Sequence, residues 1–155
     1  MQACNPLQQD IISMETAFKF RIVEISIPQF ATFESNFNSN VEDVEFETNY
    51  SYGIKPEDRL FIAILSISFF QEKRIVVKIE VNVTFELDKD TFDSYMYADK
   101  FCMSAQQLKI FTSILYGSSR GVLAAKLENS SLKNIILPLV DLDDVMTHPL
   151  EIFLA

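Results

Sequence analysis

The stretch from Ser104 to Lys126 has the spacing of a long helix, and it constrains the fold more than any other feature. Ser104 followed by Gln107 is a capping box, in which the hydroxyl accepts a backbone N–H and the amide reaches back. Side chains along one stripe recur at steps of three and four residues: Leu108, Phe111, Leu115, Ser118, Val122 and Ala125. The pattern predicts a helix that buries this stripe.

A second row of the same helix carries two glycines. It runs through Ile110, Ile114, Gly117 and Gly121. Each glycine costs about 1 kcal/mol relative to alanine inside a helix, and the close approach of another backbone is the usual compensation. We therefore predict that this row is an oligomer interface and that the helix lies between its own sheet and a second layer. The alternative is that the glycines mark a frayed helix end.

Four segments with the alternating pattern of strands precede the helix. The first begins near Thr16, changes phase at Val23–Glu24 as a bulge would, and meets Pro28, which places it at a sheet edge. The others cover residues 44–52, 60–70 and 75–87, with a tight connection at 71–73, and the third reads as a central strand. The sequence predicts an α+β fold: a four-stranded antiparallel meander, the long helix, and a short C-terminal helix capped by Asp141 or Asp143.

The segment between the last strand and the helix, residues 88–103, is rich in aromatic side chains. Two interpretations are open, because these rings either cap the core or line a groove. The aromatic residues that we consider for a groove are Phe92, Tyr95, Tyr97 and Phe101, together with Phe69 and Phe70 of the third strand.

Length, composition and charge limit the number of domains and the classes of partner that the protein can bind. The length of 155 residues predicts one domain over residues 16–155 after a mobile lead-in of residues 1–15. The net charge is −9. Nucleic acid is a poor partner for such an acidic chain, whereas basic or unfolded proteins match it better. No apolar run reaches the ~18 residues of a membrane span. Cys4 and Cys102 have no metal spacing, so we expect free thiols in a reducing, cytoplasmic setting.

Motifs of catalysis are missing from the sequence. His148 is the only histidine, and we expect it at the surface, because one histidine without partners at metal spacing makes no zinc site. The three glycines form no phosphate-binding loop. Ser118-Ser119-Arg120 lies within the helix pattern and not on a strand-to-helix turn, so it is no nucleophile elbow. We therefore predict that the protein is not an enzyme and needs neither metal nor cofactor.

The C-terminal third resembles the SecB family of export chaperones. The resemblance rests on Ser119-Arg120-Gly121 near the helix end and on the Leu-Pro-Leu-Val-Asp-Leu-Asp-Asp-Val segment of residues 137–145. The upstream order is also similar: a bent first strand ending near Phe33-Glu34, three more strands, an aromatic crossover and the helix. Together these features cover roughly residues 16–147.

The resemblance implies a homodimer or homotetramer whose helices are sandwiched between sheets. It also implies that unfolded polypeptides bind in apolar grooves, here at Phe69, Phe70, Phe92, Tyr95, Tyr97 and Phe101. Docking of the SecA motor would involve Glu34, but Lys78 stands where the family has an acidic residue. The connection from Gly121 to Leu137 is longer than in the family and the C-terminus is shorter, and these differences also argue against SecA coupling.

Three functions remain open on the sequence. The first is an ATP-independent holdase for unfolded polypeptides, which would keep preproteins competent for export. The second is a dedicated adaptor or antitoxin-type chaperone with one partner protein. The third, an enzyme acting on a small molecule, lacks a convergent set of polar residues.

Overall fold

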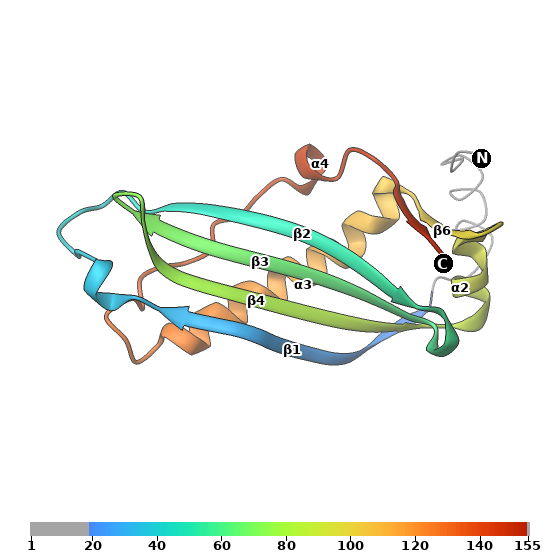
Figure 1. The fold of residues 1–155 in the computed structure, drawn as a ribbon, viewed down its shortest axis with the longest axis horizontal. Helices are drawn as coiled ribbons and strands as arrows, with labels where there is room; N and C mark the ends of the chain where they lie inside the picture. The colour runs from blue at the N-terminus through green and yellow to red at the C-terminus, as the bar shows by residue number, and fades with distance from the viewer. Residues whose placement is uncertain (1–18, 155) are drawn as a thin grey trace.

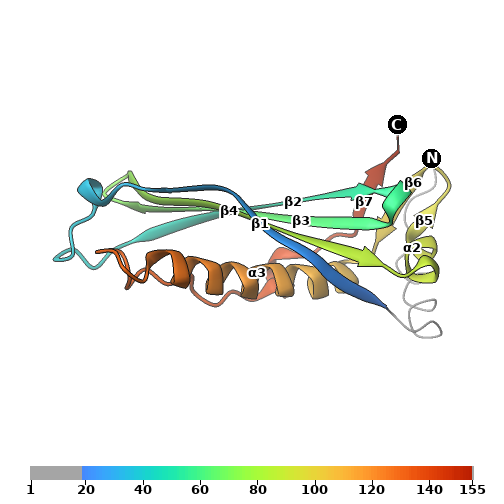
Figure 2. The same cartoon turned by 90° about the horizontal axis from the view of Figure 1, so that it is seen from below.

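A curved four-stranded antiparallel sheet with one long helix along one face forms the body of the protein (Figures 1 and 2). The computed structural model describes residues 19–154, so the predicted lead-in and the domain start at residue 16 lie outside the described residues. The strands are β1 (Phe20–Thr32), β2 (Glu45–Lys55), β3 (Leu60–Gln71) and β4 (Arg74–Leu87), in the order β1-β4-β3-β2. The long helix is α3 (Ala105–Leu127). This is the α+β architecture that the sequence predicts.

The meander is present in β2, β3 and β4 only. β1 pairs with β4, from Phe20 opposite Leu87 to Thr32 opposite Val77, and not with β2. The order is therefore that of a Greek key, because the first strand returns to lie beside the last. The alternation of side chains identifies strands but does not identify their neighbours, which is why a simple meander was expected.

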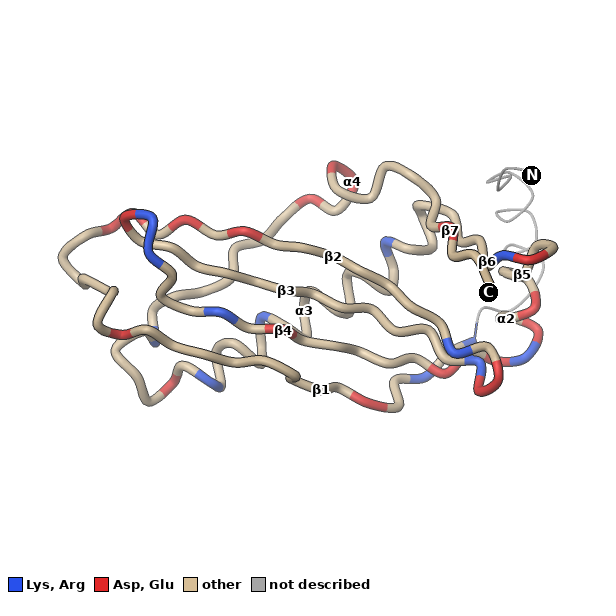
Figure 3. Tube along the Cα trace, viewed as in Figure 1, with Lys and Arg blue, Asp and Glu red and all other residues tan. Residues whose placement is uncertain are grey.

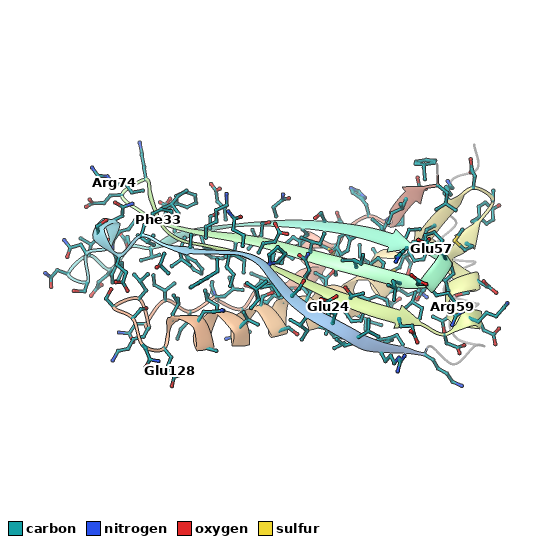
Figure 4. All side chains as sticks on the ribbon, turned by 60° about the horizontal axis from the view of Figure 1, so that its bottom comes forward. Glu24, Phe33, Glu57, Arg59, Arg74 and Glu128 are labelled. Carbon is teal, nitrogen blue, oxygen red and sulfur yellow. The ribbon has the colours of Figure 1, made fainter. Side chains whose placement is uncertain are left out.

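β1 is an irregular edge strand, as its sequence predicts. Its register against β4 shifts between Ile22 and Glu24 and again between Ser26 and Gln29, where Pro28 lies. Glu24 lies midway along β1 (Figure 4). β2, the other edge, pairs with β3 over eleven residues without a register shift. The two edges of the sheet are therefore unlike.

The turns at the ends of the sheet require left-handed backbone. Glu72 (φ 51°) and Lys73 (φ 65°) form the two-residue connection between Gln71 and Arg74, which is the predicted tight turn and has the sign of φ of a type I′ hairpin. Arg59 (φ 53°) follows the short 3₁₀ turn Pro56–Asp58 at the other end of the sheet. Figure 4 shows Arg74 and Phe33 at one end, and Glu57 and Arg59 at the opposite end.

One face of the sheet carries the hydrophobic core. The odd-numbered residues of β3 and β4 on this face are buried, from Phe61 to Phe69 and from Val77 to Leu87. The even-numbered apolar residues of β3, such as Ile62 and Ile64, are only partly buried. The expectation that the third strand is central is therefore confirmed, because β3 lies between β4 and β2. The expectation that it is covered on both faces is not met within this subunit, because the outer face of β3 is only partly buried.

α3 begins and packs largely as the sequence predicts. Ser104 is the N-cap, and its hydroxyl accepts from Gln107 N at 3.2 Å. The reciprocal bond of the capping box does not form, because Gln107 Oε1 is buried without a hydrogen-bond partner. The buried stripe follows Leu115 with Ser119, Leu123 and Leu127, not with Ser118, Val122 and Ala125. Ser119 can be buried because its hydroxyl donates to Leu115 O at 2.7 Å.

A second, small sheet closes the end of the molecule near the start of α3. The crossover contains the helix α2 (Lys89–Tyr95), then β5 (Met96–Tyr97) and β6 (Lys100–Met103), so it is more regular than the sequence suggested. The apolar C-terminal tail docks here, because β7 (Leu150–Phe153) pairs with β6. The predicted short helix is α4 (Leu142–Val145), and Asp141 caps it by accepting from Asp143 N.

Candidate polypeptide-binding groove

Most of the aromatic residues expected to line a groove lie in the core instead. Phe92 is 5% exposed, Tyr95 1% and Phe101 0%. The Phe101 ring stacks on Phe61 of β3 at 5.9 Å between centroids, and it also contacts Phe92 and Tyr95. Of the two interpretations of the crossover, the structure shows the capping one for these three rings. Burial raises the pKa of Tyr95 well above its ordinary value, as expected for a phenol without solvent.

The remaining three groove candidates differ from one another. Phe69 is 2% exposed in the core, although its ring also borders a cavity described below. Phe70 points to the opposite face of the sheet from Phe69 and is partly exposed. Tyr97, on β5, is partly exposed. The six residues therefore do not converge on one open groove in this structure.

Two open cavities instead follow the inner face of β2. The first, of about 250 Å³, is lined by Glu42, Val44, Phe46, Phe69, Asn134, Ile135, Ile136 and Pro138. The second, of about 370 Å³, is lined by Thr48, Asn49, Tyr50, Tyr52, Leu108 and the chain from Val145 to Leu150. Because β2 supplies successive inward-facing residues to one cavity and then the other, we call the two together the β2 groove.

The opposite wall of the β2 groove is formed by residues 134–149, a segment without β-strands that includes α4 and that we call the strap. In Figure 1 the strap emerges beyond the edge of the sheet that β2 forms. Polar side chains hold it without a sheet ladder. Arg120 Nε donates to Leu137 O at 2.9 Å, and the Tyr116 hydroxyl donates to Pro138 O. The Lys109 ammonium pairs with Asp143.

Tyr52, which lines the larger cavity, pairs through its hydroxyl with a buried threonine of α3. The Tyr52 and Thr112 hydroxyls lie 2.7 Å apart, and Tyr52 donates to Met146 Sδ at 3.4 Å. Thr112 is fully buried, so this pairing satisfies its hydroxyl. Burial raises the pKa of Tyr50 and Tyr52 above the ordinary value for a phenol, which is itself neutral at ordinary pH. The groove thus offers apolar and aromatic surface with neutral hydrogen-bonding groups.

The strap leaves apolar side chains in solvent. Ile136 is 66% exposed and Leu139 79% exposed. The sequence did indicate an extended apolar stretch at 135–140, but it did not indicate that this stretch would face β2. Val44, Phe46, Tyr50 and Tyr52 appear in the sequence only as the buried side of a strand. The groove was missed because its two walls lie far apart in the chain.

The predicted interface row lies together on the face of α3 that is turned away from the sheet. Ile110 is 44% exposed, Ile114 is partly exposed, and both glycines are exposed. A Cβ built on Gly117 or Gly121 would meet nothing within 4 Å among the described residues, so no neighbour in that part of the chain explains them. Both glycines lie well inside α3, which ends at Leu127, so they are not at a frayed end.

Neither of the two residues tied to SecA docking lines the β2 groove. Glu34 is exposed in a short 3₁₀ turn (Glu34–Asn36) after β1. Lys78 is partly exposed on β4, opposite Ala31 and Ser68 on the outer face of the sheet. His148 is exposed, as expected, in the segment after α4.

The cysteines differ from expectation. Cys102 is fully buried and disulfide-bonded, so the prediction of free thiols is wrong there, and Cys4 lies outside the described residues. The sequence argument for a cytoplasmic location depended on free thiols, so it is no longer supported by the cysteines. Within residues 19–154, no group of three or more acidic, histidine or cysteine side chains could hold a metal ion. None of the helices in that range has the length and apolarity needed to cross a bilayer.

Comparison with solved structures places the fold. The SecB-like chaperone Rv1957 of Mycobacterium tuberculosis, solved with a ChAD peptide from the Rv1956 HigA1 antitoxin, aligns with a TM-score of 0.56 and 11% identity, covering 88% of this chain and 98% of that one. A protein of unknown function from Streptococcus agalactiae aligns at a TM-score of 0.43 and 9% identity, covering 81% and 100%. No protein-family model and no curated sequence matches the chain. The chain has a distant SecB-like fold.

Proposed function

We propose that this protein is an ATP-independent chaperone that holds unfolded or extended polypeptides in the β2 groove. The observation that carries the proposal is the pair of adjoining cavities between β2 and the strap, lined mainly by apolar and aromatic side chains. Concave apolar surface with a few neutral hydrogen-bonding groups suits ligands that present apolar side chains. The fold supports the same function, because the aligned Mycobacterium protein is a chaperone solved with a peptide.

The proposal moves the binding site relative to the sequence prediction. Phe92, Tyr95 and Phe101 support the groove from within the core, whereas Phe46, Tyr50 and Tyr52 present surface to the client. Phe70 and Tyr97 are partly exposed outside the two cavities and are not assigned to the site. The protein acts by binding and not by catalysis, and we assign it no cofactor.

Assembly and downstream partners are part of the proposal. The open row of α3 would pack against a second copy, in a homodimer or homotetramer. We place export of preproteins and SecA docking second, because Glu34 is the single acidic residue retained from the family pattern and Lys78 opposes it in charge. A client-specific chaperone with one partner, such as an antitoxin, is the alternative that the aligned complex favours.

Light scattering of a reduced, denatured test protein tests the holdase activity. We expect the wild-type protein at near-stoichiometric amounts to slow aggregation. Ile136→Ser removes exposed apolar surface at the smaller cavity and should weaken this protection. Ile25→Ser is the matched control, because Ile25 is similarly apolar and 47% exposed but lies on β1, at the opposite edge of the sheet. Unchanged scattering at a several-fold excess of the wild type would refute a general holdase.

A pull-down with the tagged full chain separates the general chaperone from the dedicated one. Many co-purifying proteins in small amounts support the general holdase. A single stoichiometric band that is lost in Ile136→Ser supports the dedicated adaptor. A single band that Ile136→Ser retains would place the partner away from the β2 groove.

A further inference from the structure

The hydrogen-bonding pattern of the sheet shows which main-chain groups of β2 point outward. Leu87 N donates to Arg59 O at 2.9 Å, which makes the opposed residues Leu60 and Glu86 a non-hydrogen-bonded pair of β4 and β3. Leu60 therefore directs its own N–H and C=O toward β2, where it lies opposite Lys55. It follows that the odd-numbered residues of β2 bond to β3, and the even-numbered residues direct N–H and C=O to the open edge.

These outward main-chain groups belong to the same residues that line the β2 groove. They are Phe46, Thr48, Tyr50, Tyr52 and Ile54, and the first four also line the two cavities with their side chains. Within the described residues, no backbone group outside the β2–β3 ladder bonds to them. An unpaired row of N–H and C=O groups is a template for another strand.

The edge of β2 lacks the protection that the edge of β1 has. β1 carries two register shifts and Pro28, both of which hinder pairing with a further strand. β2 keeps a continuous register over eleven residues and contains no proline. A strand added at β2 would place every second side chain on the inner face, because opposed residues share a face. Those side chains would enter the two cavities in turn.

The charge around the edge selects the occupant. Glu45 and Glu47 are exposed on the outer face of β2, and Glu42 lines the smaller cavity. Asp141 and Asp144 are exposed on the strap. Figure 3 shows acidic positions, in red, along the first half of β2 and around α4. The described residues that line the cavities include no Lys or Arg.

We infer that the edge of β2 binds an extended segment of a partner polypeptide as a fifth strand, and that this segment alternates apolar with basic residues. The apolar side chains enter the β2 groove, and the basic ones lie against the acidic outer face. This inference rests on the proposed function and adds the mode of recognition and the chemistry of the client. Main-chain pairing makes binding tolerant of sequence, whereas the alternation and the charge set the preference.

Fluorescence anisotropy with labelled peptides tests the pairing. The probe is a peptide in which lysine alternates with valine, and two further versions carry N-methyl groups either on all valine amides or on all lysine amides. Only one of the two sets can face β2, so one methylated peptide should lose about tenfold or more in affinity while the other binds like the parent. Equal affinity of the two methylated peptides, whether high or low, overturns the strand pairing.

Variants of the protein supply the second arm. Thr48→Pro removes an outward N–H without breaking the ladder to β3, so the folded variant should lose the parent peptide. Undiminished affinity of folded Thr48→Pro also overturns the pairing. The joint variant Glu45→Gln with Glu47→Gln should bind the lysine peptide about two- to fivefold more weakly. Equal binding of a glutamate–valine peptide by the wild type overturns the charge preference.

Failure of the inference and failure of the proposed function have different signatures. If the two methylated peptides bind as well as the parent and Ile136→Ser weakens the binding of all three, the β2 groove is supported as the binding site and the strand pairing is refuted. If no peptide binds and aggregation is not slowed, the proposed function falls as well. A wild-type oligomer that Thr48→Pro converts to monomer would make a second copy of this chain the occupant of the edge, and would overturn the assignment to a client.

Discussion

Replacement of both helix glycines by alanine should separate the stability of the subunit from the stability of its assembly. Gly117 and Gly121 are exposed in the middle of α3, and within residues 19–154 an added Cβ meets nothing within 4 Å at either position. In a helix interior alanine is favoured over glycine by about 0.8–1.0 kcal/mol. The double variant should therefore gain roughly 2 kcal/mol in free energy of unfolding as a single subunit. For a domain of this size, that is a rise in Tm of about 4–8 °C.

The same change should have the opposite effect on an assembly built through this row. Two added methyl groups keep a second helix from approaching as closely, so the assembled form should weaken. We expect light scattering to show a lower mass for Gly117→Ala/Gly121→Ala, and urea unfolding at low protein concentration to show a more stable subunit. Gly53→Ala is the control, because Gly53 is equally unobstructed but lies on β2, where strand alternation directs its position to the face of the sheet opposite α3.

Three outcomes would refute this reasoning. A double variant with the same mass as an oligomeric wild type would show that the glycine row is not the interface. A variant that is less stable than the wild type at every concentration would show that the glycines are closely packed within the subunit itself. A wild-type protein that is monomeric at high concentration would also remove the interface.

Two further predictions concern the subunit alone. Glu72→Asn combined with Lys73→Gly should raise the free energy of unfolding by about 1–2 kcal/mol, because both positions have positive φ, and a fall in the urea midpoint would contradict this. Burial, with the charge of Tyr50 adding to it, raises the pKa of Tyr116 to about 12, above the ordinary value of 10.0. The unfolded phenol ionises first, so stability should fall as pH rises from 10 toward 12 and the fall should be smaller in Tyr116→Phe, measured by urea unfolding at pH 9 and pH 11.5.

Much of the architecture was predictable because local patterns determine it. The cap at Ser104, the phase change at Val23–Glu24 and the cap at Asp141 each depend on residues within one turn or one bulge, and all three are confirmed. The place of β1 beside β4 was not predictable, because strand alternation carries no information about the partner strand.

The candidate site was harder to predict because burial depends on distant partners. On the sequence, Phe101 could face either solvent or the core. It is buried because its ring packs on Phe61, which precedes it in the chain by two strands and a helix. The β2 groove needs Phe46 and Tyr52 on one side and the strap on the other. Neither wall has a distinctive sequence pattern by itself, so the site can be identified only from the folded structure, in which the two walls lie opposite each other.

The Greek-key order affects how the protein is made. β1 emerges from the ribosome first, yet its partner β4 ends at Leu87, and α3, which covers the sheet, is synthesised only after that. The earliest strand must therefore remain unpaired while the next three are translated. The apolar face of the sheet then remains exposed until α3 has been synthesised. The chain that we propose to bind unfolded polypeptides is therefore itself incompletely folded, with apolar surface exposed, during its own synthesis.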